Sequence, residues 1–165
     1  MKKQVTHLPT GLLCMLACLL TAVPAMAQVN YAVSGGAAYV DRSPNASGDI
    51  VIASTYSGYP VTSISERAFW PCTSLTSVTI PNSVTNIGWG AFYRCTNLTN
   101  VVLGNGVTSI GPWAFSGCTG LRSVAIPDSV TTIWNDVFYF CTGVTNVVIG
   151  NSGIVYFTNA TVLSV

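Results

Sequence analysis

The feature of this sequence that most limits its fold is a motif that returns every 23 residues. A cysteine marks each copy, with a phenylalanine three residues before it and a threonine directly after it. A fixed period of about 20 to 50 residues is typical of a solenoid, in which each repeat forms one rung and stacks on the next. The cysteines of the four copies are Cys72, Cys95, Cys118 and Cys141.

One rung, residues 75–97, illustrates the local structure that the repeat predicts. Apolar and polar side chains alternate through residues 75–80, which is the pattern of a half-buried strand. Residues 81–83 have turn chemistry, and residues 84–87 form a second short extended piece. Ala91 and Cys95 are spaced to share one face of a helix, so we expect about one helical turn there.

A single rung of this size cannot enclose its own apolar side chains, so the rungs must stack. Each strand then pairs in parallel with the next at about 4.8 Å, and equivalent apolar residues form continuous columns. The predicted fold class is therefore a repeat solenoid that is mainly β, with 23-residue rungs and short helical turns.

The N-terminus is typical of an export signal. Lys2 and Lys3 precede an apolar run over residues 11–23, and the small residues around Met26 form a cleavage pattern. We predict that residues 1–27 are a signal peptide, because the apolar run is shorter than the roughly 20 residues of a membrane span. A retained membrane anchor and a lipoprotein linked through Cys18 are the alternatives.

The repeat also suggests boundaries for the rest of the chain. Residues 28–52 lack the motif and are expected to form an N-terminal β cap that includes a hairpin around a glycine turn. The solenoid is assigned to residues 53–153. The motif decays beyond it, so residues 154–165 are either a C-terminal cap or a truncated rung. No second long apolar stretch occurs, and we expect no membrane span in the mature form.

The run Leu75-x-x-Val78-x-Ile80, with Ala91-Phe92-x-x-Cys95 after it, resembles the BspA-like leucine-rich repeat, also called the Treponema pallidum type. The resemblance covers about residues 50–157 and implies a right-handed solenoid with a parallel sheet on its concave side. Members of that family are surface or secreted proteins of bacteria and some protists, and several are linked to adhesion. The family has no shared catalytic residues to transfer to this chain.

The chain has few charged residues, and this scarcity restricts the classes of function that it can have. Beyond residue 27 the chain has four arginines, five acidic residues, no lysine and no histidine, so its net charge is near −1. This composition lacks the basic stripe of a nucleic-acid-binding protein. It also excludes a serine or cysteine nucleophile paired with histidine. Asp128 and Asp136 share one rung, but Asp128 occupies a turn column, so we do not expect a carboxylate pair for hydrolysis.

The repeated cysteines have three interpretations. We favour buried free thiols that act as small hydrophobic residues, stacked one per rung. Disulfides between neighbouring rungs are the first alternative, because export would permit them. A metal site is the least favoured, because the paired short spacings of zinc sites are absent. We predict no cofactor.

Two sets of residues are candidates for ligand binding. Aromatic residues outside the phenylalanine column could form a binding strip or could pack between rungs. The outward positions of the longer strands offer a small, uncharged surface that could bind a partner or remain merely solvated. The aromatic candidates are Trp70, Trp89, Tyr93, Trp113, Trp134 and Tyr139, and the strand candidates are Ser77, Thr79, Asn100, Ser123 and Asn146.

The sequence thus favours an exported bacterial, non-catalytic leucine-rich repeat module that binds a protein or glycan at the cell surface. The alternative is a structural spacer or a fragment of a longer surface repeat protein, and a carboxylate-based hydrolase is the least favoured. Expected partners are an extracellular protein or glycan, with no nucleic acid. Weak self-association through uncovered sheet ends is a further expectation.

Overall fold

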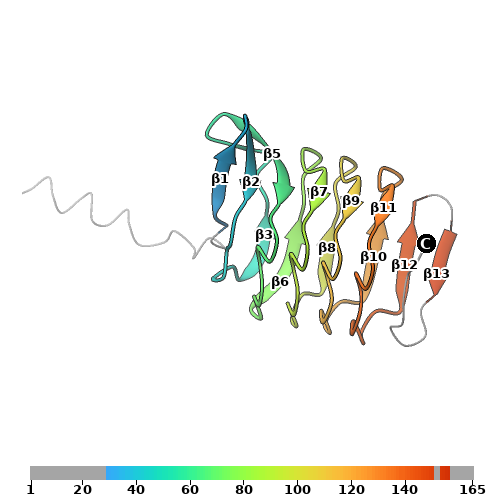
Figure 1. The fold of residues 1–165 in the computed structure, drawn as a ribbon. Helices are drawn as coiled ribbons and strands as arrows, with labels where there is room; N and C mark the ends of the chain where they lie inside the picture. Colours follow the sequence, from blue (N-terminus) through green and yellow to red (C-terminus); the bar gives the residue numbers. More distant parts are fainter. Residues whose placement is uncertain (1–28, 151–152, 157–165) are drawn as a thin grey trace, which may run out of the picture.

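The computed structural model describes residues 29–150 and the backbone of residues 153–156. The predicted signal peptide, residues 1–27, lies outside the described residues, and so do residues 157–165 of the predicted C-terminal segment. Figure 1 shows the described chain as a row of stacked rungs that runs from the N-terminal hairpin to strand β13.

Each rung contributes a short strand to one sheet and, in most rungs, a longer strand to a second side of the stack (Figure 1). Pairing along the repeats is parallel, and residues 23 positions apart are partners, as in Ser77 with Asn100 and Asn86 with Ser109. The predicted parallel solenoid of 23-residue rungs is therefore confirmed. The strands of the first sheet are β1 (Tyr31–Ser34), β2 (Ala37–Val40), β5 (Tyr59–Ile64), β7 (Asn86–Ile87), β9 (Ser109–Ile110) and β11 (Thr132–Ile133).

The second side is built from two three-stranded sheets that follow one another along the stack. Strands β8 and β10 lie side by side where the two sheets meet (Figure 1). The strands in order are β3 (Gly48–Val51), β6 (Leu75–Thr79), β8 (Asn100–Val102), β10 (Ser123–Ile126), β12 (Asn146–Ile149) and β13 (Gly153–Tyr156).

The two ends of the stack differ from the repeated rungs. Strands β1 and β2 form the predicted antiparallel hairpin around Gly35 and Gly36, and β2 joins the parallel ladder through β5. The longer loop of the first rung folds as a second hairpin, in which β4 (Thr55–Tyr56) pairs antiparallel with β5. At the other end β13 pairs antiparallel with β12, whereas a further rung would pair in parallel.

The third side of the stack, which we call the turn wall, consists of residues 65–72, 88–95, 111–118 and 134–141. The predicted helical turn in this segment is wrong, because the described residues contain no helix. Instead, successive backbone amides alternate between hydrogen bonds within a rung and hydrogen bonds to the next rung. Tyr93 N–H donates within its rung to Gly90 O at 2.9 Å, whereas Phe92 N–H donates to Ala114 O of the next rung at 2.7 Å. An α-helix would use all of these amides internally, so stacking replaces helical bonding here.

Within residues 29–150 and 153–156, no helix is present that could cross a bilayer.

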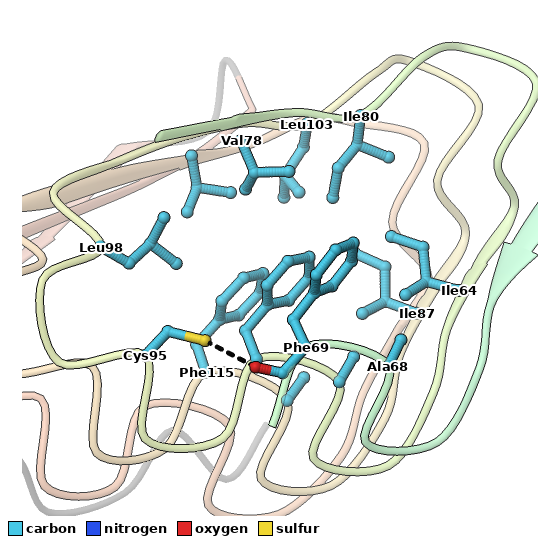
Figure 2. Packing of buried hydrophobic residues seen from close by; sticks show 14 of the residues in the cluster. Ile64, Ala68, Phe69, Val78, Ile80, Ile87, Cys95, Leu98, Leu103 and Phe115 are labelled. Carbon is cyan, nitrogen blue, oxygen red and sulfur yellow. Dashed lines mark hydrogen bonds between the residues drawn. The ribbon is translucent and has the colours of Figure 1, made fainter. Parts of the chain in front are cut away.

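The core lies between the three sides. In Figure 2, Val78, Ile80 and Leu103 form one wall, Ile64 and Ile87 lie on another, and Ala68 belongs to the turn wall. Nearly every apolar column of the repeat is buried, so each rung covers the apolar side chains of its neighbours. Burial of such residues is the main driving force for folding, at about 25 cal/mol per Å² of apolar surface.

A stack of phenylalanine rings runs along the centre of the core (Figure 2). The ring centroids of Phe69 and Phe92 are 4.9 Å apart, and those of Phe92 and Phe115 are 5.1 Å apart, with planes within 9° of parallel. Phe138 continues the stack at 5.7 Å from Phe115 but is only partly buried. The stack therefore weakens towards the last rung.

This difference predicts unequal effects of truncating two equivalent residues. Phe92→Ala removes a fully buried ring between two neighbours, so we expect a loss of about 3–5 kcal/mol in the free energy of unfolding. Phe138→Ala should cost clearly less, because Phe138 has one stacked neighbour and retains solvent contact. Urea denaturation followed by circular dichroism measures both, and equal losses would contradict a graded stack.

Candidate functional site

The outer side of the turn wall places aromatic and arginine side chains next to one another across several rungs. Within each segment the alanine, phenylalanine and cysteine positions point into the core, which leaves the intervening residues to face outward. We call the outward set the aromatic–arginine strip. It consists of Arg42 from the loop after β2 together with Arg67, Trp70, Trp89, Tyr93, Arg94 and Trp113.

The rings of the strip are in contact from rung to rung. Trp89 stacks on Trp113 with 6.1 Å between centroids, and Tyr93 lies 6.0 Å from Trp113 in a tilted arrangement. Four of the predicted aromatic residues are therefore components of one strip, since Trp70 joins it through arginine. Trp113 is also held by its indole N–H, which donates to Asp136 Oδ2 at 3.2 Å.

Arginine side chains link the rings. The guanidinium carbon of Arg67 lies 4.3 Å from the Trp89 centroid and 5.3 Å from that of Trp70. Arg42 approaches Trp70 at 5.8 Å, and Arg94 approaches Tyr93 at 5.3 Å. Each such cation–π contact contributes about 0.5–1 kcal/mol at exposed sites. The strip is consequently a partly ordered surface with positive charge along its length.

The backbone under the strip is unusual. Arg67 (φ 51°) and Trp113 (φ 56°) occupy the same column as Gly90, and Arg94 (φ 59°) and Phe140 (φ 56°) occupy the column of Gly117. The left-handed conformation costs a non-glycine residue roughly 1–2 kcal/mol. Bulky residues therefore occupy positions where glycine would fit the backbone better. What these residues add, despite the conformational cost, is an outward-facing side chain.

A pocket of about 520 Å³ opens beside the end of the strip, and we call it the turn-wall pocket. Its volume is within the range of about 300–1,000 Å³ that is typical of small-molecule sites. Residues of three successive rungs line it: Tyr93, Arg94, Thr96, Trp113, Ser116, Gly117, Thr119, Tyr139 and Phe140.

The two remaining aromatic candidates have different positions. Tyr139 lines the turn-wall pocket and meets Phe140 edge to face, with 4.5 Å between the ring centroids. Trp134 is exposed and makes no ring contact with any described residue. The structure thus brings five of the six predicted aromatic residues to one region and leaves Trp134 outside it.

The strand candidates lie in two outward columns of the second side. Ser77, Asn100, Ser123 and Asn146 fall in one column, while Thr79 falls in the other, which also contains Val102. Asn100 Nδ2 donates to Ser77 Oγ at 3.2 Å, so part of the polar column is internally bonded. The buried Asn146 Oδ1 accepts no hydrogen bond from the described residues. This surface is separate from the strip, which lies on the turn wall.

A second pocket, of about 460 Å³, lies at the turn that ends these strands. Ala125 and Val148 of the strand surface border it together with Pro127 and Asp128. Its walls are contributed mostly by turn residues, so it has fewer aromatic contacts to offer than the turn-wall pocket.

The favoured interpretation of the cysteines is confirmed: all four described cysteines are free and buried. Each thiol donates to a carbonyl beneath it; Cys95 Sγ bonds Phe69 O at 3.2 Å (Figure 2), and Cys118 Sγ bonds Phe92 O at 3.1 Å. Burial raises the pKa of Cys95 and of Cys141 to about 12, and repulsion from the Cys72 sulfur adds to the effect on Cys95. Burial also raises the pKa of Cys118.

Other chemistry finds little support in the described part of the chain. Within residues 29–150, no group of three or more histidine, cysteine, aspartate or glutamate side chains is arranged to hold a metal ion. Asp136, one of the two acids of the fourth rung, accepts the Trp113 indole bond. The arrangement therefore offers contact chemistry: stacking, hydrogen bonding and attraction of negative charge.

Sequence reasoning missed the arginines and Phe140. Arg42, Arg67 and Arg94 were counted only as charges, although Arg67 shares a column with Trp113 and Arg94 directly follows Tyr93. Phe140 falls outside every apolar column, which marks it as a residue with an outward role.

Comparison with known proteins identifies the type of repeat. Residues 53–161 match the family model described as BspA type leucine rich repeat region, with six copies. No curated protein matches the chain.

Several solved structures of similar fold are leucine-rich repeat proteins. One from Bacteroides capillosus is 29% identical with a TM-score of 0.67, over 76% of this chain and 96% of that one. The Treponema pallidum leucine rich repeat protein is 26% identical with a TM-score of 0.58, over 76% of this chain and 70% of that one. A leucine rich cell surface protein from Faecalibacterium prausnitzii is 26% identical with a TM-score of 0.54, over 74% of this chain and 41% of that one.

The thiol column predicts a specific loss of stability in alkali. Unfolded thiols release their protons above about pH 9, whereas the folded Cys95 and Cys141 thiols keep theirs until about pH 12. The unfolded chain then binds fewer protons, so the free energy of unfolding should fall as the pH rises through this window. Each thiol contributes about 1.4 kcal/mol per pH unit. Urea denaturation between pH 8 and pH 11 measures the slope.

The matched variant for this test is Cys141→Ala, which removes one titrating thiol. Its pH slope should be shallower than that of the unaltered chain, even though its stability near neutral pH is lower. An unchanged slope would show that the thiols ionise equally well in the folded chain.

The backbone under the strip yields a separate prediction. Phe140→Gly and Phe140→Ala remove the same ring contacts, and both must adopt the left-handed conformation at φ 56°, but only alanine is strained by it. We expect the glycine variant to be more stable by about 1 kcal/mol. Denaturation of the two variants side by side measures the difference, and an alanine variant of equal or greater stability would disprove the strain.

Proposed function

This chain belongs to the BspA-type leucine-rich repeat family, and we propose that it acts as a non-catalytic binding module at the cell surface. Its ligand is an extracellular protein or glycan, and its contact surface is the aromatic–arginine strip together with the turn-wall pocket. The proposal concerns recognition rather than turnover, because the outer residues of the turn wall supply stacking and charge and no reactive pair.

The observation that carries the proposal is the outward exposure of the strip on a backbone that favours glycine. Arg67, Trp113 and Arg94 all have positive φ, and Trp113 remains 39% exposed. Glycine occupies the same columns at Gly90 and Gly117, so these three side chains carry a backbone cost that a contact role would account for. Tryptophan, tyrosine and arginine are also the residues that most often dominate binding energy at interfaces.

Surface display is supported by a relative and by the N-terminal sequence. The similar Faecalibacterium prausnitzii protein is described as a cell surface protein. The charged start, apolar run and small residues before Gln28 are typical of a bacterial export signal. Thr, Ser and Asn rather than charged residues cover the outside of the rungs, which suits a module that needs little net charge of its own.

A second candidate is a structural spacer in a longer surface protein. It is favoured by the length of the Faecalibacterium prausnitzii protein, of which this chain covers 41%. A spacer, however, has no requirement for outward tryptophan and arginine at strained positions. The binding function is therefore the better supported of the two.

The test is a binding screen of the full chain against immobilised matrix proteins and a glycan array. We expect a saturable ligand whose affinity falls about tenfold or more in Trp89→Ala and Trp113→Ala, because stacked aromatic residues are frequent hot spots. Tyr59→Ala is the matched control, since Tyr59 is an exposed aromatic residue on β5 outside the strip.

Circular dichroism and thermal unfolding should accompany each variant, so that a lost fold is not mistaken for a lost contact. A folded chain with no saturable ligand would support the spacer. Equal losses in the strip variants and in Tyr59→Ala would move the contact surface elsewhere.

A further inference from the structure

The turn-wall pocket combines features that select one kind of ligand. Its walls are largely aromatic: Trp113 is 39% exposed, Tyr139 is 40% exposed and Phe140 is 59% exposed. Exposed ring faces carry partial negative charge and attract the weakly positive C–H groups of a flat or ring-shaped ligand. The six-membered ring of a pyranose sugar presents such a C–H face.

Arg94 gives the pocket its charge. Its guanidinium carbon lies 5.3 Å from the Tyr93 ring, and no carboxylate of the described residues is paired with it. No acidic residue lines the pocket. The planar guanidinium can donate two parallel hydrogen bonds to a carboxylate, and its charge repels cationic ligands such as quaternary ammonium groups.

Gly117 allows Arg94 to lie where it does. A Cβ on Gly117 would be 3.1 Å from Arg94 Cγ, so a side chain there would push the arginine stem aside. The backbone also ties the two rungs together, because Arg94 N–H donates to Ser116 O at 2.8 Å. The arginine is therefore positioned by the adjacent rung at the edge of the pocket.

Ser116 adds a hydroxyl group to the pocket lining. Only 2% of the residue's surface is exposed, and its hydroxyl makes no hydrogen bond with any described residue. The hydroxyl oxygen is accessible at the pocket, so it can take a hydrogen-bond partner from outside the chain. A ligand hydroxyl would provide one, and a sugar ring is rich in such groups.

We propose that the turn-wall pocket binds a carboxylate-bearing pyranose unit of a glycan, that is, a uronic or sialic acid residue. The sugar ring stacks on the aromatic walls, its carboxylate meets Arg94, and a ring hydroxyl bonds Ser116. This inference rests on the proposed binding function and narrows its ligand class to acidic glycans.

The experiment compares acidic ligands with neutral counterparts on the full chain. One pair is trigalacturonate and its methyl ester, which differ in the carboxylate charges and the ester methyl groups. The other pair is sialyllactose and lactose, which differ by the whole sialic acid residue. Isothermal titration and tryptophan fluorescence measure the affinities. We expect the acid of at least one pair to bind about tenfold or more tightly than its neutral partner, because of the charged hydrogen bonds. The pair that responds identifies the sugar source.

Variants separate the role of Arg94 from that of net charge. Arg94→Gln should remove the preference for the acid, while Arg122→Gln, which removes an exposed arginine outside the pocket, should retain it. Arg94→Gly is a second variant that suits the left-handed backbone, since glycine occupies the same column at Gly117. It should also abolish the preference without loss of fold.

Several results would overturn the inference and leave the binding function in place. They are equal affinity for acid and ester, tighter binding of choline than of the acids, and strip-dependent capture of a matrix protein with no carbohydrate bound. A folded chain that binds no member of the ligand pairs, no glycan of the array and no matrix protein would overturn the inference and the proposed function together.

Discussion

The fixed spacing between parallel strands determines how side chains pack throughout this molecule. Backbone hydrogen bonds such as Phe92 N–H to Ala114 O hold each rung at a fixed separation from the next, near the 4.8 Å of paired strands. A residue type that recurs in a column must then pack on its own copies at that distance. Phenylalanine rings do so at 4.9 and 5.1 Å, and glycine is required where backbones meet, since a Cβ on Gly111 would lie 2.9 Å from the Gly88 carbonyl carbon.

The same spacing acts on the outer surface with a different result. Side chains that face solvent are not forced into a core, yet Trp89 and Trp113 still stack because their rungs are neighbours. Arg67 then lies over the Trp89 ring and brings charge to a chain that has little of it. The outward strip and the inner ring stack are thus two consequences of the same repeat spacing.

The sequence was sufficient to predict the rungs, the strands and the buried thiols, because the residues that form them recur at the same position of every repeat. The helical turn was wrong, since an i, i+4 pair such as Ala91 and Cys95 also fits a turn whose alternate amides bond to the next rung. The arginine contacts could not be predicted from one rung, because Arg67 and Trp89 belong to neighbouring rungs. The positive φ values of Trp113 and Phe140 were not predicted, because neither residue favours that conformation; the only sign of it in the sequence is the glycine 23 residues earlier, at Gly90 and Gly117.

The thiol column has a consequence for how the chain reaches its folded state. In the unfolded chain the four thiols are open to solvent and ionise with ordinary acidity, so an oxidising compartment would attack them through their thiolates. After the rungs close, each is buried and donates to a carbonyl. Folding therefore competes with oxidation of the thiols, and the relative rates of the two processes matter. The rungs close only when parallel strands 23 residues apart have paired, and parallel pairing is slow compared with local contacts, so the thiols stay exposed to an oxidant until that step is complete.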